Sequence, residues 1–338
     1  MLVVEVYNMK KNLTITDIAQ MAGVGKSTVS RYFNGGYVKE STKEKIQKVI
    51  DEHHYQPNAF ARLKAKKSHI IGVIAPCLDS SVASRVLMGI DEVLQAQGYT
   101  SLIINTNHDS AQELKSMTSL YRMKVDGIII NATVVTDEHY TLAKQFDIPV
   151  IFIGQRYTQG VSIINDDTGA GVFLTDYLIK KGHQDVLVVT VDEQDEAVGI
   201  IRKQAICDTL DKHHISYRTC ISDYSFTLSK TVIKDALQSH LPSVILCSST
   251  KQLLASYHCV KELGLRIPED ISICGFGGYE YIEVLSPSLT SIQFDAKLSG
   301  NVGAKTMLSM INEEDVETTQ MIPFEFHEGN SVLDKMKG

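Results

Sequence analysis

The chain has 338 residues, of which 43% are hydrophobic and 22% charged, as is ordinary for a folded globular protein. No apolar run approaches the ~20 residues that cross a bilayer, and no low-complexity tract accompanies the 22 glycines and 7 prolines. The sequence therefore excludes an integral membrane protein, a fibrous protein and a largely disordered chain, and its length predicts two or three domains.

The formal net charge of −7 is unevenly distributed along the chain. Residues 1–68 hold 12 Lys and Arg against 6 Asp and Glu, a net charge of +6, whereas residues 69–338 hold 21 against 34, a net charge of −13. A basic head on an acidic body predicts that the head binds a polyanion. From charge alone, a solvated basic face is the alternative.

The cysteines indicate a reducing environment. There is no Cys-x-x-Cys pair, and a disulfide framework would be denser and would belong to a shorter, secreted chain. The sequence predicts free, mostly buried thiols in a cytoplasmic protein, with no metal site and no cofactor. The six are Cys77, Cys207, Cys220, Cys247, Cys259 and Cys274.

The chain is predicted to begin with a disordered extension over residues 1–8, which is apolar but short and lacks the basic segment of a signal peptide. A helix-turn-helix domain is predicted over residues 9–57. Thr14 or Thr16 can cap its first helix, and Gly23 lies where the following turn needs a positive φ. The expected helices run to about residue 22, over 26–33 and over 42–53.

The second of these helices is the one that enters the major groove in such a unit. Its residues Lys26, Ser27 and Arg31 point outward, and Arg31 can form a forked contact with guanine. An unrelated amphipathic helical hairpin is the alternative. The remaining expected DNA contacts in the head and its flanking loops are Thr14, Thr28, Ser30, Asn34, Tyr37, Tyr55 and Asn58.

Residues 58–68 form a linker that is too short to be a stable helix by itself. The sequence therefore predicts a helix that forms only under some conditions.

Three motifs in this region carry a family resemblance: Thr-x-x-Asp-Ile-Ala-x-x-Ala-Gly-Val from residue 14, Thr-Val-Ser-Arg-x-x-Asn from residue 28 and Tyr-x-Pro-Asn-x-x-Ala from residue 55. Together they resemble the LacI/GalR (lactose-repressor) family of bacterial transcriptional regulators. The resemblance implies a homodimer on near-palindromic operator DNA. It also implies a hinge helix that inserts a leucine into the minor groove.

Two departures from the family pattern concern the head and the hinge. Gly25 stands where the family usually has a serine that would cap the recognition helix. Ala61 and Leu63 match the hinge by residue type, but one residue that usually separates them is missing. One residue is ~100° of helix rotation, so the shortened hinge puts the position of Leu63 in question.

From residue 69 onward, apolar strands alternate with amphipathic helices, which predicts parallel sheets covered on both faces. The expected strands are 69–75, 100–104, 127–130, 150–153, 162–164, 186–190, 244–246 and 271–276. The expected helices are 84–97, 111–123, 169–181, 200–213, 227–239 and 251–263. The fold class is therefore α/β.

The resemblance implies that this body is a two-lobed core like that of periplasmic binding proteins. The first lobe is expected over 69–182 and 294–322, and the second over 183–293 and 323–338. In open α/β sheets, ligands bind beyond the carboxyl ends of the strands. The expected effector-binding residues in the cleft are Asp79, Arg156, Asp166, Arg202, Tyr224, Phe226, Ser249, Gly277 and Phe294.

Within that set, Arg202 matches the effector arginine of the family. The family usually has Asn-Asp where this chain has Ser249 and Thr250, and an acidic pair where it has Gly277 and Gly278. The chain lacks these groups but keeps Arg156 and Arg202, which favours an anionic ligand such as a sugar phosphate. The segments 78–80 and 251–260 are similar to those of the sucrose- or trehalose-responsive repressors of the family.

The sequence thus predicts a repressor of a carbohydrate-use operon that is controlled by a sugar or sugar phosphate bound between the lobes. No catalytic constellation stands out, so an enzyme is not expected. The alternatives are a sugar-binding module of the same fold and a degenerate regulator with impaired operator binding.

Overall fold

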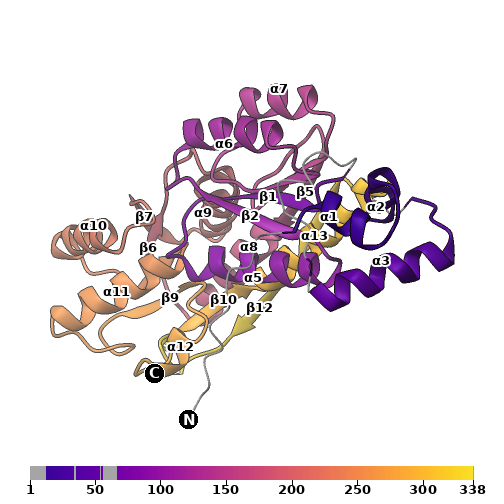
Figure 1. The fold of residues 1–338 in the computed structure, drawn as a ribbon. Helices are drawn as coiled ribbons and strands as arrows, with labels where there is room; N and C mark the ends of the chain where they lie inside the picture. Colours follow the sequence, from indigo (N-terminus) through magenta and orange to yellow (C-terminus); the bar gives the residue numbers. More distant parts are fainter. Residues whose placement is uncertain (1–12, 34–35, 54, 56–66, 338) are drawn as a thin grey trace, which may run out of the picture.

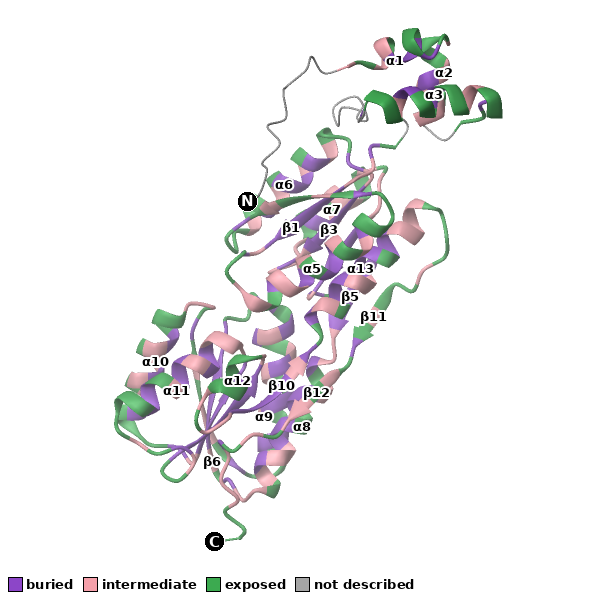
Figure 2. Ribbon diagram, turned by 60° about the horizontal axis from the view of Figure 1, so that its bottom comes forward, coloured by how far each residue is buried: buried purple, intermediate pink, exposed green. Residues whose placement is uncertain are grey.

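A computed structural model describes residues 13–33, 36–53, 55 and 67–337 (Figure 1). The predictions for the extension 1–8, for nearly all of the linker 58–68, and for Asn34, Asn58, Ala61 and Leu63 lie outside the described residues. Figure 2 shows a small helical head followed by two larger lobes along the length of the molecule.

The head consists of helices α1 (Ile15–Met21), α2 (Lys26–Phe33) and α3 (Glu40–His53). Thr14 caps α1, because its hydroxyl accepts a hydrogen bond from the Asp17 amide at 3.3 Å while the Asp17 carboxylate accepts one from the Thr14 amide at 2.7 Å. Gly23 has a φ of +65° in the turn before α2. Both features were expected, and the predicted helix-turn-helix is confirmed. Its core contains Ile18, Val29 and Ile46, all fully buried.

The first lobe contains a fully parallel six-stranded sheet of order β11-β5-β4-β3-β1-β2. Its strands are β1 (Ile70–Ala75), β2 (Thr100–Asn105), β3 (Gly127–Asn131), β4 (Val150–Ile153), β5 (Val161–Asn165) and β11 (Thr319–Ile322). One face packs against α5 (Ser81–Ala96) and α13 (Ala296–Ile311), and the other against α6 (Ser110–Arg122) and α7 (Asp137–Gln145).

The second lobe contains a sheet of order β12-β10-β9-β8-β6-β7, in which only β12 is antiparallel to its neighbour. Its strands are β6 (Asp185–Thr190), β7 (Ser216–Ile221), β8 (Val244–Cys247), β9 (Ser272–Phe276), β10 (Thr290–Phe294) and β12 (Phe324–His327). Helices α8 (Asp167–Lys180) and α9 (Lys203–Lys212) cover one face, and α10 (Phe226–Ser239) and α11 (Thr250–Glu262) cover the other.

The chain crosses between the lobes at three places in the described residues: between β5 and α8, between β10 and α13, and between β11 and β12. The first crossing differs from the expected boundary at residue 182. The apolar face of α8, with Leu174 and Leu178, packs against Val186 and Val188 of β6, so α8 belongs to the second lobe. The glycine at 182 ends a helix and does not mark the end of a lobe.

Several elements escaped the sequence analysis. Strands β7, β10, β11 and β12 are short or carry polar residues, and the edge strand β7 is largely exposed. The helix expected over 200–213 begins earlier, with a π-helix η1 (Glu196–Arg202) that continues into α9. π-Helical turns are rare and occur often at functional sites.

Helix α13 was also not predicted, although it anchors the first lobe by crossing α5 closely. A Cβ atom on Gly89 would lie 2.1 Å from the Lys297 carbonyl oxygen, and one on Gly300 would lie 2.1 Å from the Val86 carbonyl oxygen. Only glycine permits this approach of the two backbones. Among the described residues, no helix is long and apolar enough to span a membrane.

Candidate nucleic-acid interface and ligand cavity

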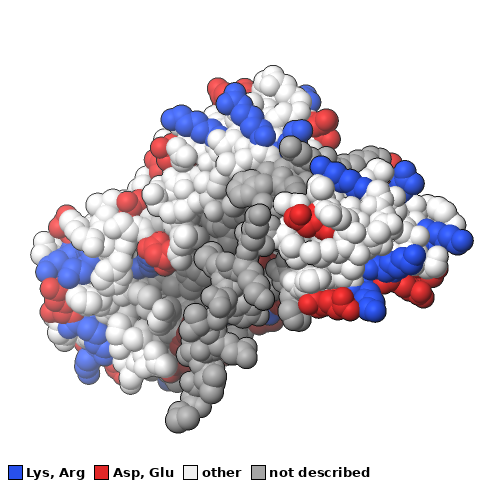
Figure 3. All heavy atoms as spheres, viewed as in Figure 1, with Lys and Arg blue, Asp and Glu red and all other residues white. Residues whose placement is uncertain are grey.

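The head presents most of its expected DNA contacts on the surface. Lys26, Ser27 and Arg31 of α2 are exposed, and Tyr37, in the segment that follows α2, is 88% exposed. Figure 3 shows Lys and Arg side chains around the head at the right of the view. Of the other expected contacts, Thr28 and Ser30 are half-buried and Thr14 is exposed.

Tyr55 differs from the other expected DNA contacts among the described residues in being buried. Its side chain is 8% exposed and packs against Phe33 at a ring-centroid distance of 5.9 Å, inside the core of the head. The burial, together with the nearby charge of Asp17, raises the pKa of its hydroxyl. The Tyr55 ring therefore stabilises the head from within, and a contact of its hydroxyl with phosphate stays a prediction.

Helix α2 starts without a side-chain cap, because Gly25 precedes it. A Cβ atom at Gly25 would meet no atom closer than 3.7 Å, so a serine fits there. A serine cap can accept a hydrogen bond from an unpaired amide of the first turn. We expect Gly25→Ser to stabilise the head by about 0.2–0.5 kcal/mol, because glycine is itself only slightly worse than serine at this position, measured by thermal unfolding of the full chain. Gly25→Ala is the matched control, and an equal gain from alanine would contradict capping as the cause.

A cavity of about 210 Å³ lies between the two lobes at the carboxyl ends of their strands. It contains five of the nine residues expected in the cleft. These are Arg202, Tyr224, Ser249, Gly277 and Phe294.

The other four expected residues do not line this cavity. Arg156 and Asp166 line a separate hollow of about 100 Å³ beside the β5–α8 crossing. Phe226 begins α10 and packs edge-on against His258, 5.9 Å between ring centroids. Asp79 follows β1, and its carboxylate binds the Nζ atom of Lys251 at 2.9 Å. Lys251 lowers the pKa of Asp79 through this hydrogen bond and its charge.

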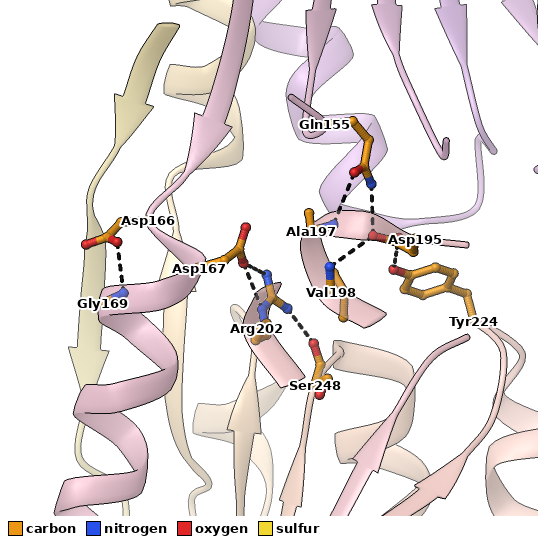
Figure 4. Close-up of polar contacts among 10 residues, drawn as sticks. All are labelled: Gln155, Asp166, Asp167, Gly169, Asp195, Ala197, Val198, Arg202, Tyr224 and Ser248. Atoms are coloured by element: carbon orange, nitrogen blue, oxygen red, sulfur yellow. Dashed lines mark hydrogen bonds and ion pairs between the residues drawn. The ribbon is translucent and has the colours of Figure 1, made fainter. Parts of the chain in front are cut away.

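Arg202, which ends the π-helix, is the most enclosed cation of the cavity wall, with 6% of its surface exposed. Its Nε donates to Asp167 Oδ1 at 2.8 Å, its Nη2 donates to the same oxygen, and its Nη1 donates to the Ser248 carbonyl at 2.5 Å (Figure 4). The guanidinium also stacks over Phe276, 4.4 Å from the ring centroid. Its charge is therefore neutralised inside the protein.

Asp195, which the sequence analysis passed over, is the centre of a second network in the same wall (Figure 4). Its carboxylate accepts hydrogen bonds from Tyr224 Oη at 2.6 Å, Gln155 Nε2 at 2.8 Å and the Val198 amide at 3.0 Å. Gln155 belongs to the first lobe, and its Oε1 accepts from the Ala197 amide at 3.1 Å. This amide side chain thus joins the two lobes twice.

His108 also reaches the cavity, from the loop after β2. Its ring stacks on Tyr224 of the second lobe at a centroid distance of 5.5 Å. Burial and the nearby charge of Lys251 lower the pKa of His108, so it is neutral at pH 7. Burial and Asp195 raise the pKa of Tyr224 well above its usual value. Both rings therefore present uncharged aromatic faces.

Thr250, at the start of α11, contacts Gly277 and Gly278, which follow β9. Gly277 has a φ of +81°, and a Cβ atom there would lie 2.0 Å from Thr250 Oγ1. The same hydroxyl accepts a hydrogen bond from the Gly278 amide at 3.0 Å. The threonine hydroxyl thus takes the space that a side chain at 277 would need.

The charges around the cavity largely cancel. Arg202 is paired with Asp167 and Lys251 with Asp79, while Asp195 makes hydrogen bonds to neutral groups only. Within the described residues, no group of three or more His, Cys, Asp or Glu side chains is placed to hold a metal ion. All six cysteines are free, as expected. The arrangement suits a neutral ligand with hydroxyl groups.

Comparison with families of known proteins gives two matches. Residues 68–329 match a profile described as the periplasmic binding proteins and sugar-binding domain of the LacI family. Residues 14–58 match a profile described as bacterial regulatory proteins of the lacI family.

Individual relatives cover nearly the whole chain. The sucrose operon repressor of Staphylococcus xylosus is 32% identical over 92% of this chain and 98% of its own length. Catabolite control protein A of Staphylococcus epidermidis is 29% identical over 92% of this chain and 96% of its own. A lac repressor dimer, solved with operator and an anti-inducer, has a similar fold, with a TM-score of 0.85 at 23% identity over 96% of this chain and 100% of that one.

Proposed function

This chain belongs to the LacI family of bacterial regulatory proteins, and from that premise we propose that it represses a carbohydrate-use operon and that a neutral disaccharide controls this repression. It is a DNA-binding transcriptional regulator whose head reads operator DNA and whose cavity between the lobes takes the effector. The observation that carries the proposed effector class is the internal pairing of Arg202 with Asp167.

The neutral charge of the effector follows from that pairing. A phosphate needs a cation that is free to bind it, but Arg202 and Lys251 each hold a carboxylate, and Arg156 lies in the other hollow. Asp195 adds a further negative charge to the wall. These contacts favour a neutral sugar over the sugar phosphate that the sequence had suggested.

The disaccharide fits the wall's chemistry and the relatives. Tyr224, Phe294 and Tyr279 line the cavity beside hydroxyl, amide and carboxylate groups, including those of Asn131 and Ser249. Aromatic faces pack on the apolar side of a sugar ring, while a few polar groups fix its orientation. A relative at 32% identity is a sucrose operon repressor, so sucrose is the first effector to test.

The regulator acts as a cytoplasmic homodimer on a near-palindromic site, as in the LacI family. Effector binding changes the angle between the lobes, and that change alters how the heads engage the two half-sites. Such coupling is reciprocal, since operator binding must change effector affinity by the same factor. Gln155, which bonds both Asp195 and Ala197, is the side chain best placed to sense the lobe angle.

The test is selection of sheared genomic DNA from the source organism on the purified full-length protein, followed by sequencing. We expect recovery of a near-palindrome beside genes for sugar uptake and breakdown. Recovery of no sequence above background, at low salt and with each sugar of a panel, would contradict a functional repressor. It would favour the degenerate regulator or the sugar-binding module.

A further inference from the structure

Two ion pairs join the lobes beside the cavity. Asp79, in the loop after β1 of the first lobe, binds Lys251 in the first turn of α11 of the second lobe at 2.9 Å. Arg85 of α5 in the first lobe binds Glu280, in the loop after β9 of the second lobe, at 2.6 Å. Each pair therefore exists only while the lobes keep this relative position.

Both pairs are attached to the cavity wall. Lys251 lines the cavity itself. The Arg85 guanidinium stacks over the ring of Tyr279, 4.6 Å from its centroid, and Tyr279 lines the cavity while its hydroxyl donates to the Phe294 carbonyl at 3.2 Å. Tyr279 also packs against the hydrophobic core of the first lobe. Separation of the lobes would thus open the cavity and break both pairs together.

The pairs are weak enough to open. The carboxylates of Asp79 and Glu280 are 75% and 62% exposed, and exposed ion pairs contribute little and are screened by salt. A ligand can shift a two-state equilibrium only by its differential affinity for the two states. The two ion pairs therefore add only a small increment to the closed state, beside the buried Gln155 hydrogen bonds that also join the lobes, and a sugar can outweigh that increment.

We propose that Asp79–Lys251 and Arg85–Glu280 form an electrostatic latch that closes the cavity, and that effector exchange requires this latch to open. The inference rests on the proposed function, because it concerns access to the proposed effector site. Its test needs no effector and no DNA, so the latch and the proposed function can fail separately.

The chain carries its own reporter for opening. Cys77 lines the cavity, is 8% exposed and is a free thiol. Cys247 and Cys274 are fully buried in the second lobe and report unfolding. The experiment measures alkylation of each cysteine by iodoacetamide in the full-length protein at fixed pH, using peptide mass spectrometry.

We expect Glu280→Gln and Lys251→Met each to accelerate alkylation of Cys77 about two- to five-fold, as the loss of one exposed pair allows. Burial and the charge of Asp79 raise the pKa of the Cys77 thiol, and the charge of Lys251 partly offsets that rise. Removal of Lys251 alone would therefore slow alkylation, and an acceleration reports opening. Glu280 is not among the groups that shift this thiol. The charge swap Arg85→Glu with Glu280→Arg is the matched control and should restore the slow rate.

Added NaCl should accelerate alkylation of Cys77 in the unmodified protein more than in the double variant Lys251→Met with Glu280→Gln. Equal Cys77 rates in the unmodified protein and both single variants would overturn the latch. A charge swap that stays as fast as Glu280→Gln would also overturn it. Parallel acceleration of Cys247 and Cys274 would assign the effect to unfolding and would equally contradict the proposal.

Discussion

Asp167→Asn should lower the free energy of unfolding by about 3–5 kcal/mol, because it leaves the buried guanidinium of Arg202 without its counter-charge. Both side chains are nearly enclosed, and Asp167 Oδ1 accepts from two nitrogens of Arg202. Removal of one partner of a buried ion pair destabilises a protein far more than replacement of both partners by apolar residues of similar volume. Urea denaturation of the full-length protein, followed by circular dichroism, measures the effect.

The double variant Asp167→Asn with Arg202→Met is the control. It removes the stranded charge as well, so we expect it to unfold at a higher urea concentration than Asp167→Asn alone, although it has one more substitution. If the double variant were less stable by the sum of the losses from Asp167→Asn and from Arg202→Met, each measured alone, the two residues would act independently. The buried pair would then not organise the cavity wall.

Arg31→Ala should weaken operator binding by about 1–3 kcal/mol and relax specificity at one base pair of each half-site. Arg31 is exposed on α2 of the head, and a forked arginine contact to guanine is the commonest specific readout in the major groove. Binding to the selected operator and to its single-base variants, measured by fluorescence anisotropy at fixed salt, gives both quantities.

Lys26→Ala is the matched control, since Lys26 is an exposed cation at the opposite end of α2. The loss of a phosphate contact should weaken binding about equally on all DNA sequences and should reduce the salt dependence of binding. If Arg31→Ala showed this uniform pattern, Arg31 would be a phosphate contact and base readout would belong to other residues.

The head could be predicted from sequence because its determinants are local. The cap at Thr14, the positive φ at Gly23 and the spacing of Ile18 and Val29 lie within one short stretch, and the structure keeps all of them. The burial of Tyr55 was not predicted, because a tyrosine after a helix looks the same whether it faces solvent or Phe33. That choice depends on tertiary packing.

The lobes could be predicted as a class of fold but not in their connections. Alternating strands and helices indicated parallel sheets, yet the lobe to which α8 belongs is decided by packing against Val186 and Val188, which sequence order does not show. The rule that ligands bind at strand ends found Arg202 and Tyr224 in the cavity. It also selected Arg156 and Asp166, because it does not distinguish the two sides of a crossing strand.

Asp195 and Gln155 show a further limit of the same rule. Asp195 lies five residues beyond β6 and caps the start of the π-helix, where no helical periodicity reveals the direction of its side chain. The signal that was available is its position after a buried strand, next to the expected effector arginine. Its role became visible only through its contacts with Tyr224 and Gln155, which lie far from it in the sequence.

If a neutral sugar between the lobes controls operator binding by the head, the operator affinity must change with the concentration of that sugar. The most direct measurement is operator affinity of the full-length protein by fluorescence anisotropy across a sucrose titration, with sorbitol as the osmotic control. We predict a saturable change in operator Kd of about 5- to 150-fold with sucrose or another neutral disaccharide, and none with sorbitol. An operator Kd that stays constant with every neutral disaccharide, or that responds only to sugar phosphates, would contradict this account.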